Sequence, residues 1–143
     1  MKNIKPKLIK LFKEGYCIPQ IARIAKKINE PSTTIHYNIK SLEKEGTIKT
    51  YKAVFDYKKI DEGFCAYVLI NNKGEEGARA LAKRKEVESV DLITGDWELL
   101  VKVRTKDQDE FYKFLYDLLY KEKFQKTLSL VSLKQFKTEF VSS

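Results

Sequence analysis

A stretch near the N-terminus, residues 32–45, carries side chains of the types that read the edges of DNA bases. At about 100° of rotation per residue, Ile35, Ile39 and Leu42 fall on one helix face, which must be buried. The opposite face and its flank hold hydroxyl, phenol, imidazole and ammonium groups and no carboxylate. Its residues are Thr33, His36, Tyr37, Lys40, Ser41 and Lys44. Major-groove recognition needs short hydrogen-bonding groups near a helix start and cations near phosphates, so this face predicts contact with duplex DNA.

The candidate DNA-binding residues divide by the role that each side chain suits. Thr33, His36 and Tyr37 suit base edges, whereas ammonium and guanidinium groups suit phosphates. The full predicted set is Arg23, Lys26, Lys27, Thr33, Thr34, His36, Tyr37, Lys40, Ser41 and Lys44. The competing interpretation is a solvated helix face in a small bundle, which the lack of carboxylates disfavours.

The distribution of charge along the chain supports the DNA interpretation. The 143 residues carry a formal net charge of +8 at pH 7. Residues 1–62 hold 14 Lys and Arg against 7 Asp and Glu, a net of +7, whereas residues 63–143 hold 14 against 13. Positive charge concentrated in one half predicts that this half meets a polyanion, with nucleic acid first and an anionic membrane second.

Three short helices must position this face. Apolar residues recur at helical spacing over residues 4–14, 18–28 and 32–45. Gly15 ends the first helix and Gly46 the third, because glycine takes the left-handed conformation that follows many helices.

A tight turn joins the second and third helices. Its sequence is NEPS, with Ser32 as the predicted N-cap of the third helix. Two short helices joined in this way predict a helix-turn-helix. Residues 47–62 have strand propensity without a helical period, and we predict a strand linker there.

The second half alternates in the order strand, helix, strand, strand, helix, strand. This βαββαβ order is that of the ferredoxin-like fold, so the whole chain is predicted to be α+β. The first strand is apolar on both faces, with Val68 and Ile70 on one and Tyr67 and Leu69 on the other. Two helices cover only one face of such a sheet, which predicts that a second copy of the chain covers the other.

Common catalytic and metal-binding motifs do not occur in the sequence. It contains no P-loop, GxSxG, GxGxxG or HExxH, and its single histidine, His36, cannot form a histidine pair within one chain. We therefore predict no enzyme activity, metal or cofactor. Cys17 and Cys65 lack CxxC spacing and are predicted to be reduced thiols. With no long apolar run and no secretory signal, a cytoplasmic protein is expected, not one of the membrane.

Two motifs resemble the Lrp/AsnC family, the feast/famine transcription regulators of bacteria and archaea. The first is STTIHYNIKSLEKEGTIKTYKAVFDYKKI, with apolar and glycine positions at family spacing. The second is Thr94-Gly95-Asp96-Trp97-Glu98, where the family typically has Thr-Gly-Asp-Tyr-Asp. The resemblance covers nearly the whole chain. It implies an N-terminal DNA-binding domain, a C-terminal effector and oligomerisation domain, and dimers that assemble into larger rings.

The resemblance also implies an effector site at the hairpin turn. It places Thr94, Gly95, Asp96 and Trp97 near an amino acid bound between dimers. A turn that contains glycine offers backbone N–H groups to a carboxylate, and Asp96 can accept from an ammonium group. The competing interpretation is a plain hairpin turn with a structural glycine.

These observations predict a three-part chain that regulates transcription. Residues 1–46 form the helix-turn-helix domain, 47–62 the linker, and 63–143 the ferredoxin-like effector-binding and oligomerisation domain. The expected function is sequence-specific binding of double-stranded DNA by a homodimer, assembling to a tetramer or octamer, with an amino-acid effector that modulates assembly or binding. The alternative is an architectural DNA-binding protein with little sequence preference and no effector.

Overall fold

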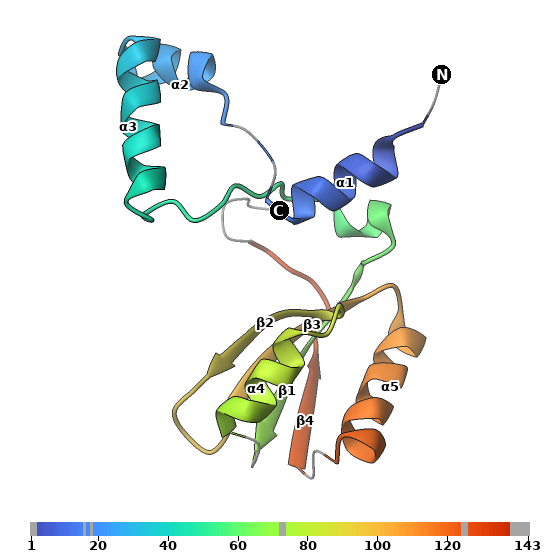
Figure 1. Cartoon of the computed structure of the whole chain (residues 1–143). Coiled ribbons are helices and arrows are strands. Elements are labelled where there is room, and N and C mark those ends of the chain that lie inside the picture. The colour runs from blue at the N-terminus through green and yellow to red at the C-terminus, as the bar shows by residue number, and fades with distance from the viewer. Residues whose placement is uncertain (1–2, 16, 18, 72–73, 124–125, 138–143) are drawn as a thin grey trace. The chain divides into compact units, whose positions relative to one another are not determined.

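The computed structural model of the chain describes residues 3–15, 17, 19–71, 74–123 and 126–137. The chain divides into two compact units, Met1–Val54 and Phe55–Ser143. The first is helical and the second is built on a four-stranded sheet (Figure 1). Across the described ranges, no helix is both long enough and apolar enough to cross a membrane.

The first unit contains α1 (Lys5–Lys13), α2 (Ile21–Ile28) and α3 (Ser32–Lys44). α2 and α3 pack against each other, and Ile35 of α3 is buried at 5% exposure. The chain leaves α2 through Asn29, which has a left-handed backbone with φ of 55°. Asparagine tolerates this conformation better than most residues. The predicted helix-turn-helix is therefore present. Of its predicted inner face, Ile35 is buried and Ile39 half-buried, whereas Leu42 is 37% exposed.

The predicted N-cap of α3 is wrong by one residue. Ser32 is the first helical residue, because Pro31 has the extended backbone of a cap, with φ −60° and ψ 143°. The Pro31 carbonyl accepts the first helical hydrogen bond, from the Ile35 N–H at 3.1 Å. The fixed φ of proline suits this place, where no backbone N–H is needed.

The predicted strand after α3 is also wrong. Residues 47–62 contain no strand: residues 47–54 are neither helix nor strand, and Tyr57–Ile60 form a 3-10 helix. A strand needs a neighbouring strand for its hydrogen bonds, and the described part of the first unit supplies none. The segment is held to the helices instead. The Tyr51 phenol donates to Glu43 Oε1 at 3.0 Å, and Gly15, with φ of 96°, lies so close that a Cβ there would overlap Thr50 Oγ1.

The second unit begins with a short 3-10 helix, η1 (Tyr57–Ile60), and then follows the predicted βαββαβ order. Its elements are β1 (Phe64–Asn71), α4 (Gly74–Ala82), β2 (Val87–Leu92), β3 (Leu99–Thr105), α5 (Gln108–Tyr116), the π-helical turn η2 (Asp117–Lys121) and β4 (Lys126–Val131). The strands are antiparallel in the order β2-β3-β1-β4.

α4 and α5 lie on the same face of this sheet and close the hydrophobic core (Figure 1). Alternate residues of β1 and β3 point to the helices and are fully buried, and Leu81, Phe111, Phe114 and Leu118 of the helical layer pack on them. α5 starts where Asp107 caps it, its carboxylate accepting from the Glu110 N–H at 3.0 Å. Asp109 and Glu110 are acids in the first turn of α5, where the helix dipole favours negative charge.

The other face of the sheet, called the open face below, carries no helix. By strand register it consists of Cys65, Tyr67, Leu69, Leu100, Lys102, Arg104, Leu128 and Leu130. Leu128 and Leu130 are 44% and 49% exposed. Glu88 pairs with both Arg104 (3.0 Å) and Lys102 (3.7 Å), so the side near β2 is charged and the side near β4 is apolar. Burial raises the pKa of the Cys65 thiol despite these two cations, which keeps the thiol protonated.

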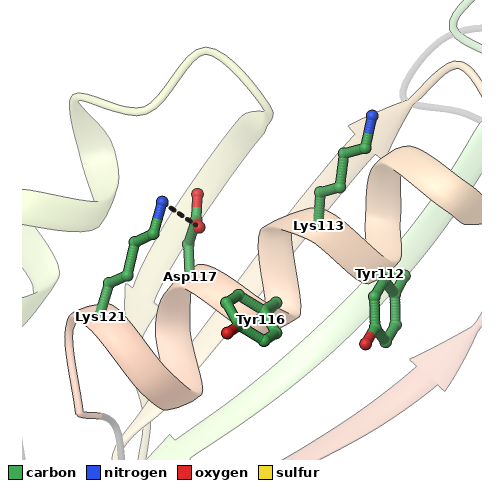
Figure 2. Close-up of a pocket in the computed structure, with 5 residues that line it drawn as sticks. All are labelled: Tyr112, Lys113, Tyr116, Asp117 and Lys121. Atoms are coloured by element: carbon green, nitrogen blue, oxygen red, sulfur yellow. Dashed lines mark ion pairs between the residues drawn. The ribbon is translucent and has the colours of Figure 1, made fainter.

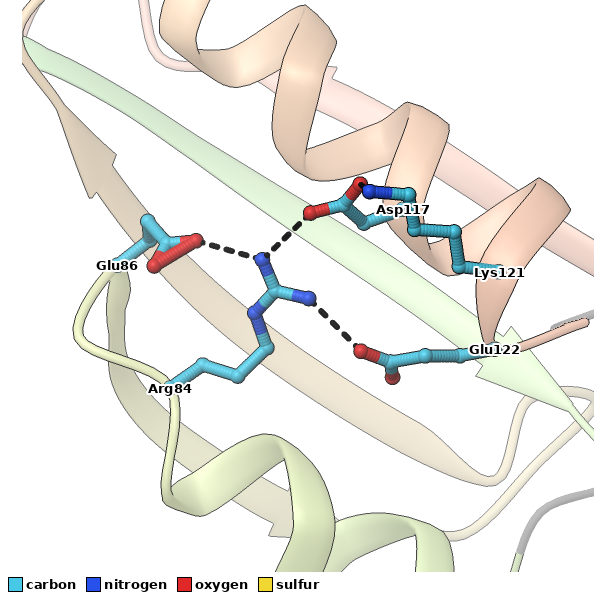
Figure 3. A network of polar contacts seen from close by, with 5 residues as sticks. All are labelled: Arg84, Glu86, Asp117, Lys121 and Glu122. Carbon is cyan, nitrogen blue, oxygen red and sulfur yellow. Dashed lines mark hydrogen bonds and ion pairs between the residues drawn. The ribbon is translucent and has the colours of Figure 1, made fainter.

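A polar cluster around Arg84 ties the segment after α4 to the end of α5 (Figure 3). The guanidinium donates to Glu86 (2.9 Å), Asp117 (3.2 Å) and Glu122 (2.7 Å). Partial burial alone would lower the pKa of Arg84, but these three hydrogen bonds outweigh it and raise the pKa. The hydrogen bond from Arg84 in turn lowers the pKa of Asp117. The cluster therefore joins two parts of the helical layer by charge instead of apolar packing.

We expect Arg84→Met to lower the free energy of unfolding at neutral pH by about 1–3 kcal/mol, because three carboxylates would lose their common cation. The folded-state pKa of Asp117 is lowered, so its contribution is present above the unfolded pKa and is lost as the pH falls through the folded one. The difference between variant and wild type should therefore shrink in acid. Urea unfolding across the pH range measures it.

The control is Arg79→Met, since Arg79 forms only an exposed pair with Glu75 at 3.3 Å. Such a pair contributes about 0–1 kcal/mol. Equal effects of the two substitutions would contradict the role given to Arg84.

Candidate nucleic-acid interface and effector turn

Several residues of the predicted recognition face of α3 line one groove. Thr33, His36, Tyr37 and Lys40 line it together with Ser32 and with Ile21 at the start of α2, and its volume is about 520 Å³. Tyr37 is 75% exposed. The groove thus combines hydroxyl, imidazole, phenol and ammonium groups on one exposed helix face, which is a set able to hydrogen-bond base edges and phosphates.

The remaining predicted cations lie outside this groove. Arg23, Lys26 and Lys27 are exposed on α2, and Lys44 is exposed at the end of α3. Exposed cations beside a recognition helix suit the phosphate backbone, which needs charge and reach more than a shaped pocket.

Two predicted residues are placed differently from the others. Thr34 lines a second, apolar groove with Ile24 and Ile39, and its carbonyl accepts from Asn38 Nδ2 at 2.7 Å. Ser41 is half-buried and donates its hydroxyl to Glu45 Oε1 at 3.0 Å. These two side chains do not line the groove that Tyr37 lines, and a carboxylate lies beside the end of the face.

The first turn of α3 is also suited to an anion. No side chain caps this end of the helix, and Pro31 at the cap carries no hydroxyl or carboxylate. The N–H groups of the first turn have no intrahelical partner and carry partial positive charge. A phosphate oxygen at this end would satisfy them.

The predicted effector turn closes the hairpin between β2 and β3. The Ile93 N–H donates to the Glu98 carbonyl at 2.9 Å, which leaves Thr94, Gly95, Asp96 and Trp97 as the loop. Gly95 has φ of 108°, a conformation that other residues rarely adopt. Thr94, Gly95 and Asp96 are exposed and Trp97 is half-buried.

Asn71 at the end of β1 is hydrogen-bonded to this turn. Its Nδ2 donates to the Asp96 carbonyl at 2.8 Å, and its Oδ1 accepts from the Glu98 N–H at 2.8 Å. The Glu98 carboxylate in turn accepts from the Gly74 N–H at the start of α4. Sequence reasoning missed Asn71, because it lies 25 residues from Asp96 and no local pattern marks it.

Lys126 is a second residue near the turn that the sequence did not indicate. Its ammonium lies 5.4 Å from the centre of the Trp97 ring, within the range of a cation–π contact. Lys126 also pairs with Asn71 in the β1–β4 register. The turn is thus flanked by an aromatic ring and one cation.

A separate hollow of about 490 Å³ lies along α5 and η2 (Figure 2). Tyr112 and Tyr116 project to one side of the helix, and Lys113, Asp117 and Lys121 to the other. The tyrosine rings follow each other with Tyr120, at centroid distances of 6.4 and 4.8 Å. Their spacing favours an oligomer contact or an amphipathic flank. In the described ranges, no group of three or more His, Cys, Asp or Glu could hold a metal ion.

A helix-turn-helix unit followed by a βαββαβ unit defines a class of transcriptional regulators with a ligand-binding domain. The Lrp/AsnC ligand binding domain matches residues 65–141. An uncharacterized HTH-type transcriptional regulator of Pyrococcus abyssi is 35% identical over 126 residues, covering 83% of this chain and 84% of its own. The HTH-type regulator FL11 of Pyrococcus horikoshii is 32% identical over 118 residues, covering 80% and 78%. The chain belongs to the Lrp/AsnC family, whose members are transcriptional regulators and not enzymes.

Solved structures show the same fold. An AsnC family regulator from Agrobacterium tumefaciens matches 96% of this chain and 94% of its own with a TM-score of 0.74 at 21% identity. A transcriptional regulator from Neisseria meningitidis, solved as a complex with L-Met, matches 96% and 93% with a TM-score of 0.75 at 20% identity. The predicted α+β fold, with a helix-turn-helix followed by a ferredoxin-like domain, is confirmed.

Proposed function

We propose that the chain is a sequence-specific DNA-binding transcriptional regulator whose assembly or DNA binding responds to an amino acid. The groove on α3 carries this proposal, because four side chains able to contact bases or phosphates share it on an exposed helix. Regulators of this family bind DNA. The concentration of net positive charge in residues 1–62 points to the same partner.

A homodimer forms through the open face in this proposal. A single copy leaves Leu128 and Leu130 close to half exposed, whereas β1 and β3 are fully buried on the helix side of the sheet. Stacking of two such faces would remove this apolar surface from water, and a two-fold axis would present two α3 helices to DNA. Dimers would then assemble to tetramers or octamers, as the family resemblance implies.

An amino acid is the proposed effector, bound at the turn of residues 94–97. The Neisseria meningitidis regulator of the same fold was solved with L-Met. Backbone N–H groups of the turn suit the carboxylate, and Asp96 suits the ammonium group. The effector would shift assembly or the spacing of the helix-turn-helix units, and only through unequal affinity for the two states.

Two substitutions on α3 should separate phosphate contact from base contact. Lys40→Ala should weaken binding to every duplex alike and reduce the slope of log affinity against log salt by about 0.9. Tyr37→Ala should instead weaken only the preferred duplex, by roughly 1–3 kcal/mol if a good base contact is lost. Fluorescence anisotropy with a duplex selected from a random pool, and with its scrambled version, measures both.

The matched control is Lys85→Ala, which removes an exposed lysine of the second unit and should change neither quantity. If Tyr37→Ala keeps the full preference for the selected duplex, the base-contact assignment fails. If the wild type binds both duplexes equally and protects DNA continuously, the architectural alternative replaces regulation.

A further inference from the structure

The two hydrogen bonds of Asn71 fix the orientation of the peptide groups in the effector turn. The Asp96 carbonyl and the Trp97 N–H belong to one planar trans peptide, so they point in opposite directions. Because the Asp96 carbonyl points to Asn71 Nδ2 at 2.8 Å, the Trp97 N–H points away from Asn71. One carboxamide thus determines where a donor of the turn is directed.

The turn contains backbone N–H groups without an acceptor among the described residues. In the described part of the chain, the N–H groups of Gly95, Asp96 and Trp97 donate to no protein acceptor. Two carbonyls at the turn are engaged, because the Asp96 carbonyl accepts from Asn71 and the Glu98 carbonyl accepts from the Ile93 N–H. Free N–H groups at a turn can bind an anionic group such as a carboxylate.

We propose that Asn71 is a positioning residue for the effector, holding residues 94–97 so that their free N–H groups converge on the carboxylate of an amino acid. This inference rests on the proposed effector site. Asn71 itself does not touch the ligand. It acts through the Asp96 carbonyl and the Glu98 N–H, and Glu98 extends the connection to Gly74 at the start of α4.

Removing the carboxamide should weaken effector binding without unfolding the domain. Asn71→Ala loses both hydrogen bonds, and we expect the dissociation constant for the amino acid to rise roughly tenfold or more. Calorimetry measures the constant. Trp97 is the only tryptophan of the chain, so its emission reports the turn directly. The emission change on adding the amino acid should be smaller in the variant at equal saturation.

Asn71→Asp provides a further test, the pH dependence of effector affinity, which would not change if Asn71 only stabilised the fold. The carboxylate can still accept from the Glu98 N–H, but it repels the Asp96 carbonyl and cannot donate to it. Protonation restores a donor, so the affinity of this variant should recover as the pH is lowered from about 7 to about 4, through the pKa of the new carboxyl. The Asp96 carbonyl and the Glu98 carboxylate raise this pKa, and the Lys126 ammonium lowers it. The wild-type affinity should stay nearly constant over this range.

The control for general destabilisation is Asp107→Ala, which removes the cap of α5 and should leave effector affinity unchanged. If Asn71→Ala binds the amino acid as the wild type does, the role of Asn71 is overturned while the site stands. If the wild type binds none of the common amino acids, both the proposed effector site and the role of Asn71 are contradicted.

Discussion

Leu69→Lys should dissociate the assembly and lower DNA affinity more than any other single change considered. Leu69 lies at the centre of the open face, between Leu100 on β3 and Leu128 on β4 in the strand register. In the single chain a lysine there reaches solvent, so the domain should fold. In a stacked dimer the same ammonium group would be buried without a partner, which costs several kcal/mol.

The loss of assembly should carry over to DNA. A dimer holds two recognition helices about 34–36 Å apart, which lets both contact one operator. A monomer binds with one helix and loses the gain of linked sites, which is about 10²–10⁴-fold. Sedimentation velocity should show smaller particles, and anisotropy should show the weaker binding in the same samples.

The control is Ala80→Lys, which adds the same charge at an exposed position of α4 and should leave both measurements unchanged. Circular dichroism of Leu69→Lys should match that of the wild type, because the core lies on the other face of β1. A Leu69→Lys protein of unchanged mass and footprint would remove the open face as the dimer contact.

Asp96→Ala should abolish the response to the amino acid and leave effector-free DNA binding intact. The carboxylate is exposed, and Asp96 is the acidic residue of the turn 94–97. An amino acid needs partners for both of its charges. Loss of a charge-assisted hydrogen bond to the ammonium group should therefore weaken binding roughly 10- to 150-fold, about 1.5–3 kcal/mol.

Calorimetry with each common amino acid is the direct measurement, and Asp109→Ala, at an exposed position in the first turn of α5, is the control. If the wild type binds no amino acid with a dissociation constant below about 1 mM, residues 94–97 form a structural hairpin turn and not an effector site. If Asp96→Ala binds the amino acid as tightly as the wild type, the ammonium group is bound by a residue other than Asp96.

Local sequence patterns predicted the elements well because each was set by periodicity or turn chemistry. The row of Ile35, Ile39 and Leu42 predicted the inner face of α3, and the structure buries Ile35. The alternation in β1 predicted two apolar faces, and Val68 and Ile70 are fully buried on the side of the helices. These signals depend only on neighbours within a few residues, so they can be read from the chain.

Features that depend on distant residues could not be predicted in the same way. Nothing near Asn71 shows that its carboxamide reaches Asp96. Nothing near Arg84 shows that it meets Asp117 and Glu122, more than 30 residues away. The linker strand failed for a related reason, because strand propensity states a preference and the partner strand must come from elsewhere.

β4 forms an edge of the sheet, and its far side meets no other strand of the described chain. The segment that begins there, residues 127–133, contains no charge, and Leu133 is 95% exposed. Edge strands with this composition recruit further chains and start aggregation. A free subunit of the proposed dimer would expose the open face in addition to this edge. Free subunits would then precipitate or be degraded, so the lifetime of the proposed dimer would limit the concentration of active regulator.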